Sequence, residues 1–221
     1  MGISTQRSTF ITWNRETGET FHNFITWKDL RADEMVRKWN SSVALKVMHG
    51  VSHCLYFVTR SKRFLAGSVI KLMNAQTTPR LCWMLQNNKK LQQAIEDKCA
   101  LFGTLDSWLL YRLRQGKSRS KYVEHISDVT SCAATGFYDP FTMQWAKWAV
   151  SLFSIKVPSD AFQLFNFCPN WCFVLLQMEL LPKVVDDSYD FGYIDRELFG
   201  HEIRIGCSVR KVHSFCIRIE I

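Results

Sequence analysis

Residues 3–27 decide how the fold begins, and they read ISTQRSTFITW (3–13), NRETGE (14–19) and TFHNFITW (20–27). The first and third segments are rich in Thr, Ile and aromatic residues, which favour extended backbone. Between them, Asn14 and Gly18 supply turn chemistry, because both residue types tolerate the tight conformations of a chain reversal. The stretch therefore predicts a β-hairpin with one strand over 3–13 and the other over 20–27.

Downstream of the hairpin, apolar residues recur at helical spacing. From Asp29 they share one face, which predicts an amphipathic helix with a break near 40–42. The residues of this face are Leu30, Met35, Val36, Trp39, Val43 and Val47. Thr104 is placed to cap a later helix over 106–113 by accepting a backbone N–H with its hydroxyl, and Gly116 is placed to end it.

The remaining pattern alternates between helical and extended segments. Shorter helical faces are expected over 64–72, 81–85, 91–95 and 141–153, and extended or turn structure over 127–139. No internal repeat interrupts this order, so repeat architectures are excluded. The sequence therefore predicts a mixed α/β fold.

Composition indicates a packed protein without a nucleic-acid motif. Hydrophobic residues make up 47% of the 221 residues, which is enough for a sizeable core. The formal net charge of +8 favours anionic partners in general. The basic residues gather once, at Arg112, Arg114, Lys117, Arg119 and Lys121. No aromatic–basic alternation accompanies this cluster, so we interpret it as a solvated loop, and a nucleic-acid binder stays an alternative class.

The cysteines form no zinc pattern. Of the eight, only Cys168 and Cys172 lie close together, and we expect reduced thiols of a cytoplasmic protein, with a metal or disulfide at this pair as the alternative.

The most apolar stretch, 161–181, contains Pro169 and several polar residues, which argues against a membrane helix. His125, His201 and His213 are expected to be structural or solvated, and the start of the chain resembles no secretory leader.

Five motifs in order carry a resemblance to a known family. The segment 2–9, GISTQRST, is similar to a strand and loop that ends in Gln-Arg, and 23–29, NFITWKD, to a Trp-bearing segment that precedes a helix. The segment 75–87, AQTTPRLCWMLQN, is similar to a signature with a basic residue three before a Trp. The segments 102–109 (FGTLDSWL) and 125–139, with 180–192 after them, continue the likeness. Together they resemble the FGGY carbohydrate kinases, and within them the glycerol kinases, the divergent vertebrate group most of all.

The resemblance implies a fold and a substrate site. The family's ribonuclease H-like, actin-type fold pairs two α/β domains across a cleft, and the chain is expected to contain most of the first domain without its opening strands. Gln6, Arg7, Ser8 and Trp27 match substrate-binding positions, where a guanidinium and polar groups hold polyol hydroxyls against an aromatic wall. Ser8 stands where glycerol kinases have a carboxylate, and Ala75 where the family has a Tyr.

The resemblance also implies which parts of a kinase to expect outside this chain. Family members use ATP and Mg²⁺, and their phosphate loop would precede Gly2. The catalytic Asp of their Asp-Gln-Gln run would follow a segment like 203–209, where this sequence continues Arg210-Lys211-Val212-His213. We therefore expect no catalytic residue and no metal ligand here, with family-like parts over 1–155 and 180–209, an atypical insert over 156–179 and an unrelated tail over 210–221.

Three hypotheses follow. The first is an ATP-dependent kinase that phosphorylates glycerol, a small polyol, with this form inactive by itself. The second is a non-catalytic binding or regulatory module that pairs with a full-length kinase. The third, the nucleic-acid binder, depends only on the net charge and the basic cluster. An incomplete domain would leave a sheet edge and apolar helix faces uncovered, so poor solubility is expected.

Overall fold

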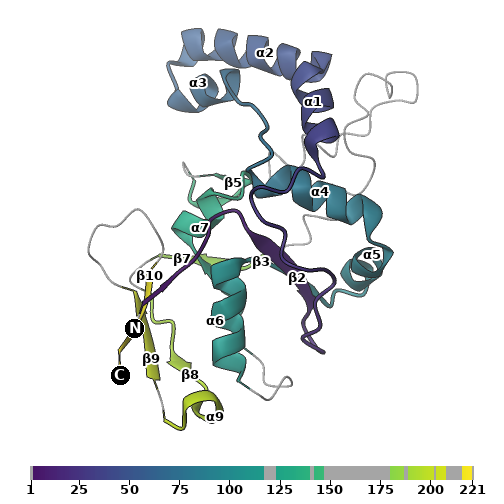
Figure 1. The fold of residues 1–221 in the computed structure, drawn as a ribbon. Coiled ribbons are helices and arrows are strands. Elements are labelled where there is room, and N and C mark those ends of the chain that lie inside the picture. Colours follow the sequence, from purple (N-terminus) through teal and green to yellow (C-terminus); the bar gives the residue numbers. More distant parts are fainter. Residues whose placement is uncertain are drawn as a thin grey trace.

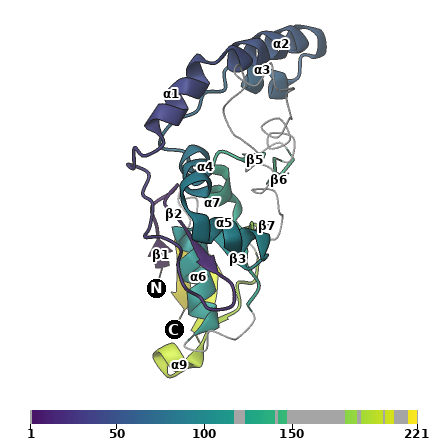
Figure 2. The same ribbon diagram turned by 90° about the vertical axis from the view of Figure 1, so that its right-hand side faces the viewer.

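The computed structural model describes residues 2–116, 123–139, 142–146, 180–186, 189–201, 203–207 and 216–220. Helices and short sheets form an α/β body, and three helices extend from one end of it (Figure 1). A view from the side shows the same extension opposite the end where both termini lie (Figure 2). The predicted α/β class is confirmed.

The predicted hairpin is confirmed at its turn, but its first strand is divided. Strand β1 (Gly2–Ser4) and strand β2 (Phe10–Asn14) are separated by a turn, so a single strand over 3–13 is wrong. The returning chain meets β2 only at two isolated bridges, Phe10 with Ile25 and Trp13 with Thr20. The regular partner of β2 is β3 (Ala100–Thr104), which runs antiparallel to it.

The helical extension consists of α1 (Asp33–Ser41), α2 (Val43–Thr59) and α3 (Lys62–Ser68). The predicted break is confirmed, because Ser42 leaves helical geometry and its hydroxyl accepts the backbone N–H of Leu45 at 3.2 Å. The first helix begins at Asp33 rather than Asp29. The helix α2 runs twelve residues beyond the predicted end at Val47, to Thr59.

Two helices cover the β2–β3 pair, and a third follows it. Helix α4 (Thr77–Asn87) and helix α5 (Lys89–Glu96) bury their apolar faces in the main core, and α6 (Leu105–Gln115) leaves the end of β3 (Figure 1). Gly116 ends α6 at a φ of 70°, as expected. The predicted cap at Thr104 is wrong in detail: Thr104 precedes the helix, but its hydroxyl lies 3.0 Å from the Ser107 hydroxyl and caps no backbone N–H.

Beyond α6, short elements complete the body. Strand β4 (Ile126–Asp128) pairs in parallel with β7 (Lys183–Val185), and β5 (Tyr138–Asp139) pairs with β6 (Gln144–Trp145). Helix α7 (Val129–Ala133) interrupts the stretch predicted as extended, because the Asp128 carboxylate caps its first turn. The helix predicted over 141–153 is wrong where it is described, since 142–146 form a turn and β6.

The largest sheet brings the ends of the chain together. Its order is β1, β10 (Cys216–Glu220), β9 (Ile203–Cys207) and β8 (Tyr193–Ile194), all antiparallel, with α9 (Arg196–Phe199) between β8 and β9. Part of the tail that the sequence set apart therefore pairs with β1 and β9. The Cys168–Cys172 pair and the atypical insert lie outside the described residues.

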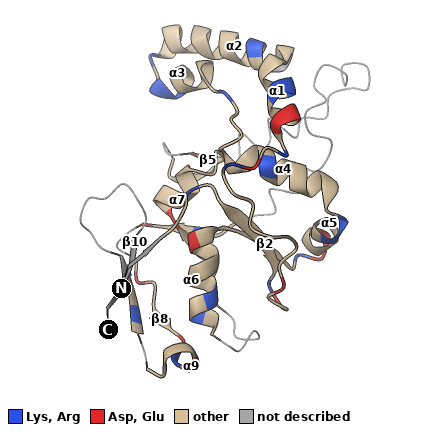
Figure 3. Ribbon diagram, in the orientation of Figure 1, with Lys and Arg blue, Asp and Glu red and all other residues tan. Residues whose placement is uncertain are grey.

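Basic residues are spread over the described helices. Lys and Arg occur on α1, α2, α3, α4, α5, α6 and α9 (Figure 3). Of the basic cluster, Arg112 and Arg114 lie on α6, and its other members fall outside the described residues. Among the described helices, none is both long and apolar enough to cross a membrane.

Candidate functional site

The Gln6–Ser8 turn presents one charged side chain to solvent and buries its neighbour. Gln6 and Arg7 are exposed, whereas Ser8 is buried. Ser8 has a φ of 61°, in the left-handed region that a residue with a Cβ adopts at a cost. Its hydroxyl donates to the Ala134 carbonyl at 2.9 Å. The Thr9 hydroxyl donates to the Gln6 side-chain carbonyl at 3.3 Å and orders the turn from the other side.

Trp27 lies on a second exposed segment, directly after the part of the chain that bridges to β2. It is 44% exposed, so a large aromatic surface faces solvent. The ammonium of Lys28 lies 5.3 Å from the centre of this ring. Such a face suits the C–H side of a polyol, which an exposed aromatic ring can cover.

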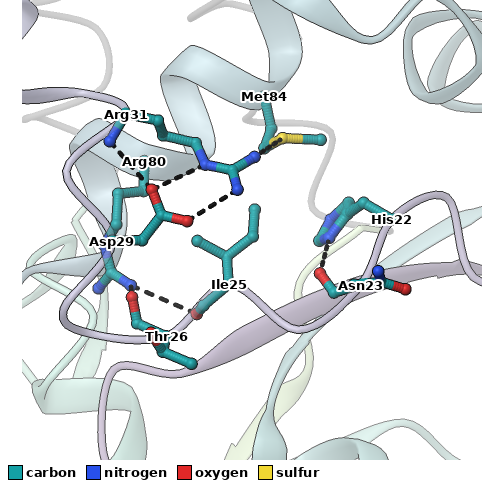
Figure 4. Close-up of polar contacts among 8 residues, drawn as sticks. All are labelled: His22, Asn23, Ile25, Thr26, Asp29, Arg31, Arg80 and Met84. Carbon is teal, nitrogen blue, oxygen red and sulfur yellow. Dashed lines mark hydrogen bonds and ion pairs between the residues drawn. The ribbon is translucent and has the colours of Figure 1, made fainter.

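Arg80 joins these segments. It lies on α4, it is fully buried, and its guanidinium donates five hydrogen bonds, all to backbone carbonyls. Its Nη2 reaches the carbonyls of Ser8 at 2.8 Å and Ala75 at 2.9 Å. Its Nη1 reaches those of Ile25 at 3.3 Å and Thr26, and Figure 4 shows this group beside Asp29. The fifth bond, from Nε, goes to the Gln76 carbonyl at 3.1 Å.

A carboxylate–guanidinium pair lies beside Arg80 (Figure 4). Asp29 accepts two side-chain hydrogen bonds from Arg31, at 2.9 and 2.7 Å. These bonds lower the pKa of Asp29 below its ordinary value, with Arg80 contributing through its charge. The Arg31 guanidinium also stacks 5.1 Å from the centre of the Trp83 ring and donates to the Met84 sulfur at 3.2 Å.

Burial lowers the pKa of Arg80 to about 10, mainly because its charged form loses hydration. The group therefore stays protonated at neutral pH, with the neighbouring Asp29 supporting its charge. Against its other side lies the ring of Phe10, 5.7 Å from the guanidinium carbon. A buried cation of this kind is stable only when its donors are satisfied, which the five carbonyls achieve.

The structure thus connects the predicted site positions through their backbones. Arg80 contacts the carbonyl of Ser8, that of Thr26 next to Trp27, and that of Ala75. Sequence reasoning identified Arg80 as the basic residue of a signature but gave it no role. A cation within an otherwise uncharged, largely buried helix was the available signal, because a charge in such a place needs partners.

A second buried polar cluster lies at the start of α6. The Ser107 hydroxyl donates to the Ser127 hydroxyl at 2.6 Å and lies 3.0 Å from that of Thr104. Burial raises the pKa of the adjacent Asp106 carboxyl, and hydrogen bonds from surrounding hydroxyl groups offset part of this rise. This cluster joins the carboxyl end of β3 to that of β4. Within the described part of the chain, no three His, Cys, Asp or Glu residues are grouped so that they could hold a metal ion.

Comparison with known proteins identifies the chain's relatives. A glycerol kinase 5 of Bos taurus is 42% identical over 205 residues, which cover 93% of this chain and 34% of that protein. A glycerol kinase of Verminephrobacter eiseniae is 29% identical, covering 93% and 32%. The chain therefore spans about a third of the length of these relatives.

Solved structures agree on the fold. The crystal structure of Plasmodium falciparum glycerol kinase with ADP superimposes with a TM-score of 0.56 at 23% identity, over 88% of this chain and 30% of that one. A gluconate kinase from Lactobacillus acidophilus gives a TM-score of 0.54 at 18% identity. The model of the N-terminal domain of the FGGY family of carbohydrate kinases matches residues 1–162. The chain belongs to the FGGY family of carbohydrate kinases.

Proposed function

We propose that this chain carries the polyol-binding part of a glycerol kinase-type enzyme, which in its whole form uses ATP to phosphorylate glycerol to glycerol 3-phosphate. The observation that supports this most is the frame around Arg80. Arg80 donates to carbonyls of three separate segments: Ser8, which follows the exposed Arg7, Thr26, which precedes the exposed Trp27, and Ala75. A guanidinium to pair with hydroxyls and an aromatic face to cover C–H groups are what polyol recognition requires.

Two positions would recognise the polyol differently from other glycerol kinases. Ser8 uses its hydroxyl proton on the Ala134 carbonyl, so this side chain can only accept from a substrate. Ala75 has no polar group in its side chain. We therefore assign the main contacts to Arg7 and Trp27, with Gln6 beside them and Ser8 as a secondary acceptor.

ATP and Mg²⁺ are the family's co-substrate and metal, and we assign no described residue to them. Magnesium held with substrate phosphates takes one or two protein carboxylates. Asp29, a carboxylate beside Arg80, is bound by Arg31, which lowers its pKa and makes it a poor base. We derive no phosphoryl-transfer step from these residues.

We infer that the chain by itself does not turn over glycerol. The test is a coupled assay of ADP release with glycerol and Mg·ATP, and no turnover is the expected result. Turnover by the purified chain would overturn the inference. The finer fold assignment, a ribonuclease H-like first domain, belongs to the same proposal, as do the boundaries 1–155, 156–179 and 180–209 and a cytoplasmic location.

Polyol binding is tested separately from turnover. Saturation-transfer NMR with glycerol should give a signal for the wild-type chain, and Trp27→Ala should weaken it because the aromatic wall is lost. Phe57→Ala is the matched control, since Phe57 is also exposed but lies on α2. Equal loss of signal in both variants would contradict a specific site at Trp27.

The alternative function is a non-catalytic module that pairs with a full-length kinase. It is favoured by the exposed apolar stripe on α2, formed by Val43, Val47, Val51 and Val58 at helical spacing. Co-purification with an intact glycerol kinase, lost in a Val47→Glu variant, is the result that supports it. Recovery of the chain alone excludes this pairing.

A further inference from the structure

Arg80 donates hydrogen bonds to all three segments of the proposed site. Each of its five N–H groups donates to a backbone carbonyl. These carbonyls belong to the turn at Ser8, to the segment before Trp27, and to the residues that precede α4. The three segments are separated by many residues in the sequence, and the Arg80 guanidinium contacts all of them.

An independent observation at Ser8 indicates that the arrangement is held under strain. Ser8 has a positive φ, and its carbonyl accepts from Arg80 Nη2 at 2.8 Å and from the Thr77 hydroxyl at 3.4 Å, while its own hydroxyl donates to the Ala134 carbonyl at 2.9 Å. A strained residue persists only where its surroundings over-determine it, and such residues gather at functional sites. The strain here directs Arg7 outward while Ser8 points inward.

We propose that Arg80 is a positioning residue for the polyol site. It holds the Arg7–Ser8 turn, the Trp27 segment and the residues before α4 in one geometry, and thereby sets the affinity for the polyol without touching it. This inference rests on the proposed function. A guanidinium suits the role and an ammonium does not, because lysine offers only three donors from one point and could not make at least two of the five hydrogen bonds.

The test compares Arg80→Lys and Arg80→Met with wild type by hydrogen–deuterium exchange and by glycerol titration. Loss of a buried hydrogen bond is expected to raise exchange by about tenfold or more in peptides over 5–9, 24–28 and 74–78 together, most in Arg80→Met. Glycerol affinity should fall by about tenfold or more in both variants. Peptides of α6 should exchange as in wild type.

The matched control is Arg114→Lys. Arg114 is a partly buried arginine that also donates to a backbone carbonyl, that of Glu124 at 2.9 Å, but it lies on α6. Its replacement should leave the three site segments and the glycerol affinity unchanged. A general loosening in every variant would show that Arg80 only stabilises the fold, and would overturn the proposal.

Two further outcomes separate this inference from the proposed function. Faster exchange in the three segments with unchanged glycerol affinity would overturn the positioning role while the polyol site stands. If the wild-type chain binds no glycerol, the proposed function fails. The exchange measurement still tests whether Arg80 holds the three segments together. Faster exchange in the Arg80 variants, confined to these segments, supports this. Unchanged exchange there overturns it.

Discussion

The body and the helical extension use similar residues in opposite ways. In the body, Phe10 and Phe102 are 0% and 1% exposed and pack with α4 and α5. In the extension, Val58 and Phe57 of α2 are 82% and 59% exposed. A sheet pair faces the helices of the body, whereas α2 has α3 on one side and an open face on the other (Figure 1). The apolar residues of a helix therefore do not show by themselves whether they are buried, because burial depends on the surface that the helix packs against.

The largest effect expected from this comparison is that of a truncated ring in the body. Phe102→Ala should lower the free energy of unfolding by about 3–5 kcal/mol, because the ring packs between Phe10 and Phe137 and leaves a cavity. Phe57→Ala on α2 removes the same ring from an exposed place and should cost less than about 0.5 kcal/mol. Urea denaturation measures both, and equal losses would erase the distinction between the regions.

The next effect is a pH dependence that originates in the body. His125 is half-buried, but both of its ring nitrogens are shielded from solvent, and its ring packs against those of Trp13 and Tyr111. This burial lowers its pKa from 6.5 to about 3, with the charge of Arg15 adding to the shift. Below about pH 6.5 His125 binds a proton in the unfolded chain, whereas in the folded chain it stays neutral down to about pH 3. The free energy of unfolding therefore falls as the pH falls from 6.5 toward 3. The loss is about 1.4 kcal/mol for each pH unit.

Urea midpoints between about pH 6.5 and about pH 5 separate the histidines from the carboxyl groups with lowered pKa, such as Asp29 and Glu124, which lose their contribution only at lower pH. His125→Phe should flatten the profile. Burial lowers the pKa of His22 as well, and this residue should account for the smaller slope that remains. An unchanged slope in His125→Phe would contradict the burial of His125.

A smaller effect is expected at the cap that ties α5 to the hairpin. The Asn88 side chain accepts the Leu91 N–H at 3.0 Å and donates to the Phe21 carbonyl at 3.1 Å. Asn88→Ala should cost about 1–2 kcal/mol by thermal or urea unfolding. The side chain of its neighbour Asn87 donates to the Trp83 carbonyl of the same helix at 2.8 Å, and Asn87→Ala should cost less. A larger loss of stability in Asn87→Ala than in Asn88→Ala would contradict the assignment of Asn88 as the cap.

The smallest expected effect on stability comes from the extension. Val51→Lys replaces a half-exposed residue of the α2 stripe and should change the free energy of unfolding by less than about 0.5 kcal/mol. It should also reduce self-association of the chain, because an exposed apolar stripe is shortened. Sedimentation velocity measures this, and a large loss of stability would mean that the stripe is packed.

The sequence predicted local features well and distant pairings poorly. The turn at Asn14–Glu19, the break at Ser42 and the end of α6 at Gly116 follow from the chemistry of the residues themselves. The pairing of β2 with β3 joins residues some ninety positions apart, and no local pattern specifies it. Strand β1 likewise pairs with β10 from the far end of the chain.

For the candidate site, the family motifs supplied the positions but not the geometry. They indicated Arg7, Ser8 and Trp27, and the structure describes Arg7 and Trp27 as exposed and Ser8 as buried and strained. The role of Arg80 could not be predicted, because its acceptors are backbone carbonyls, which every residue has and which leave no mark in the sequence.

That choice of acceptors has an evolutionary consequence. Since Arg80 donates to main-chain oxygens, exchanging the side chains at positions 8 and 75 removes none of its hydrogen bonds, provided the backbone keeps its path. The serine and the alanine that stand where the family resemblance implies an acid and a tyrosine are changes of this kind. Under the proposed function, selectivity among small polyalcohols can therefore change at these positions while the backbone arrangement around Arg80 is kept.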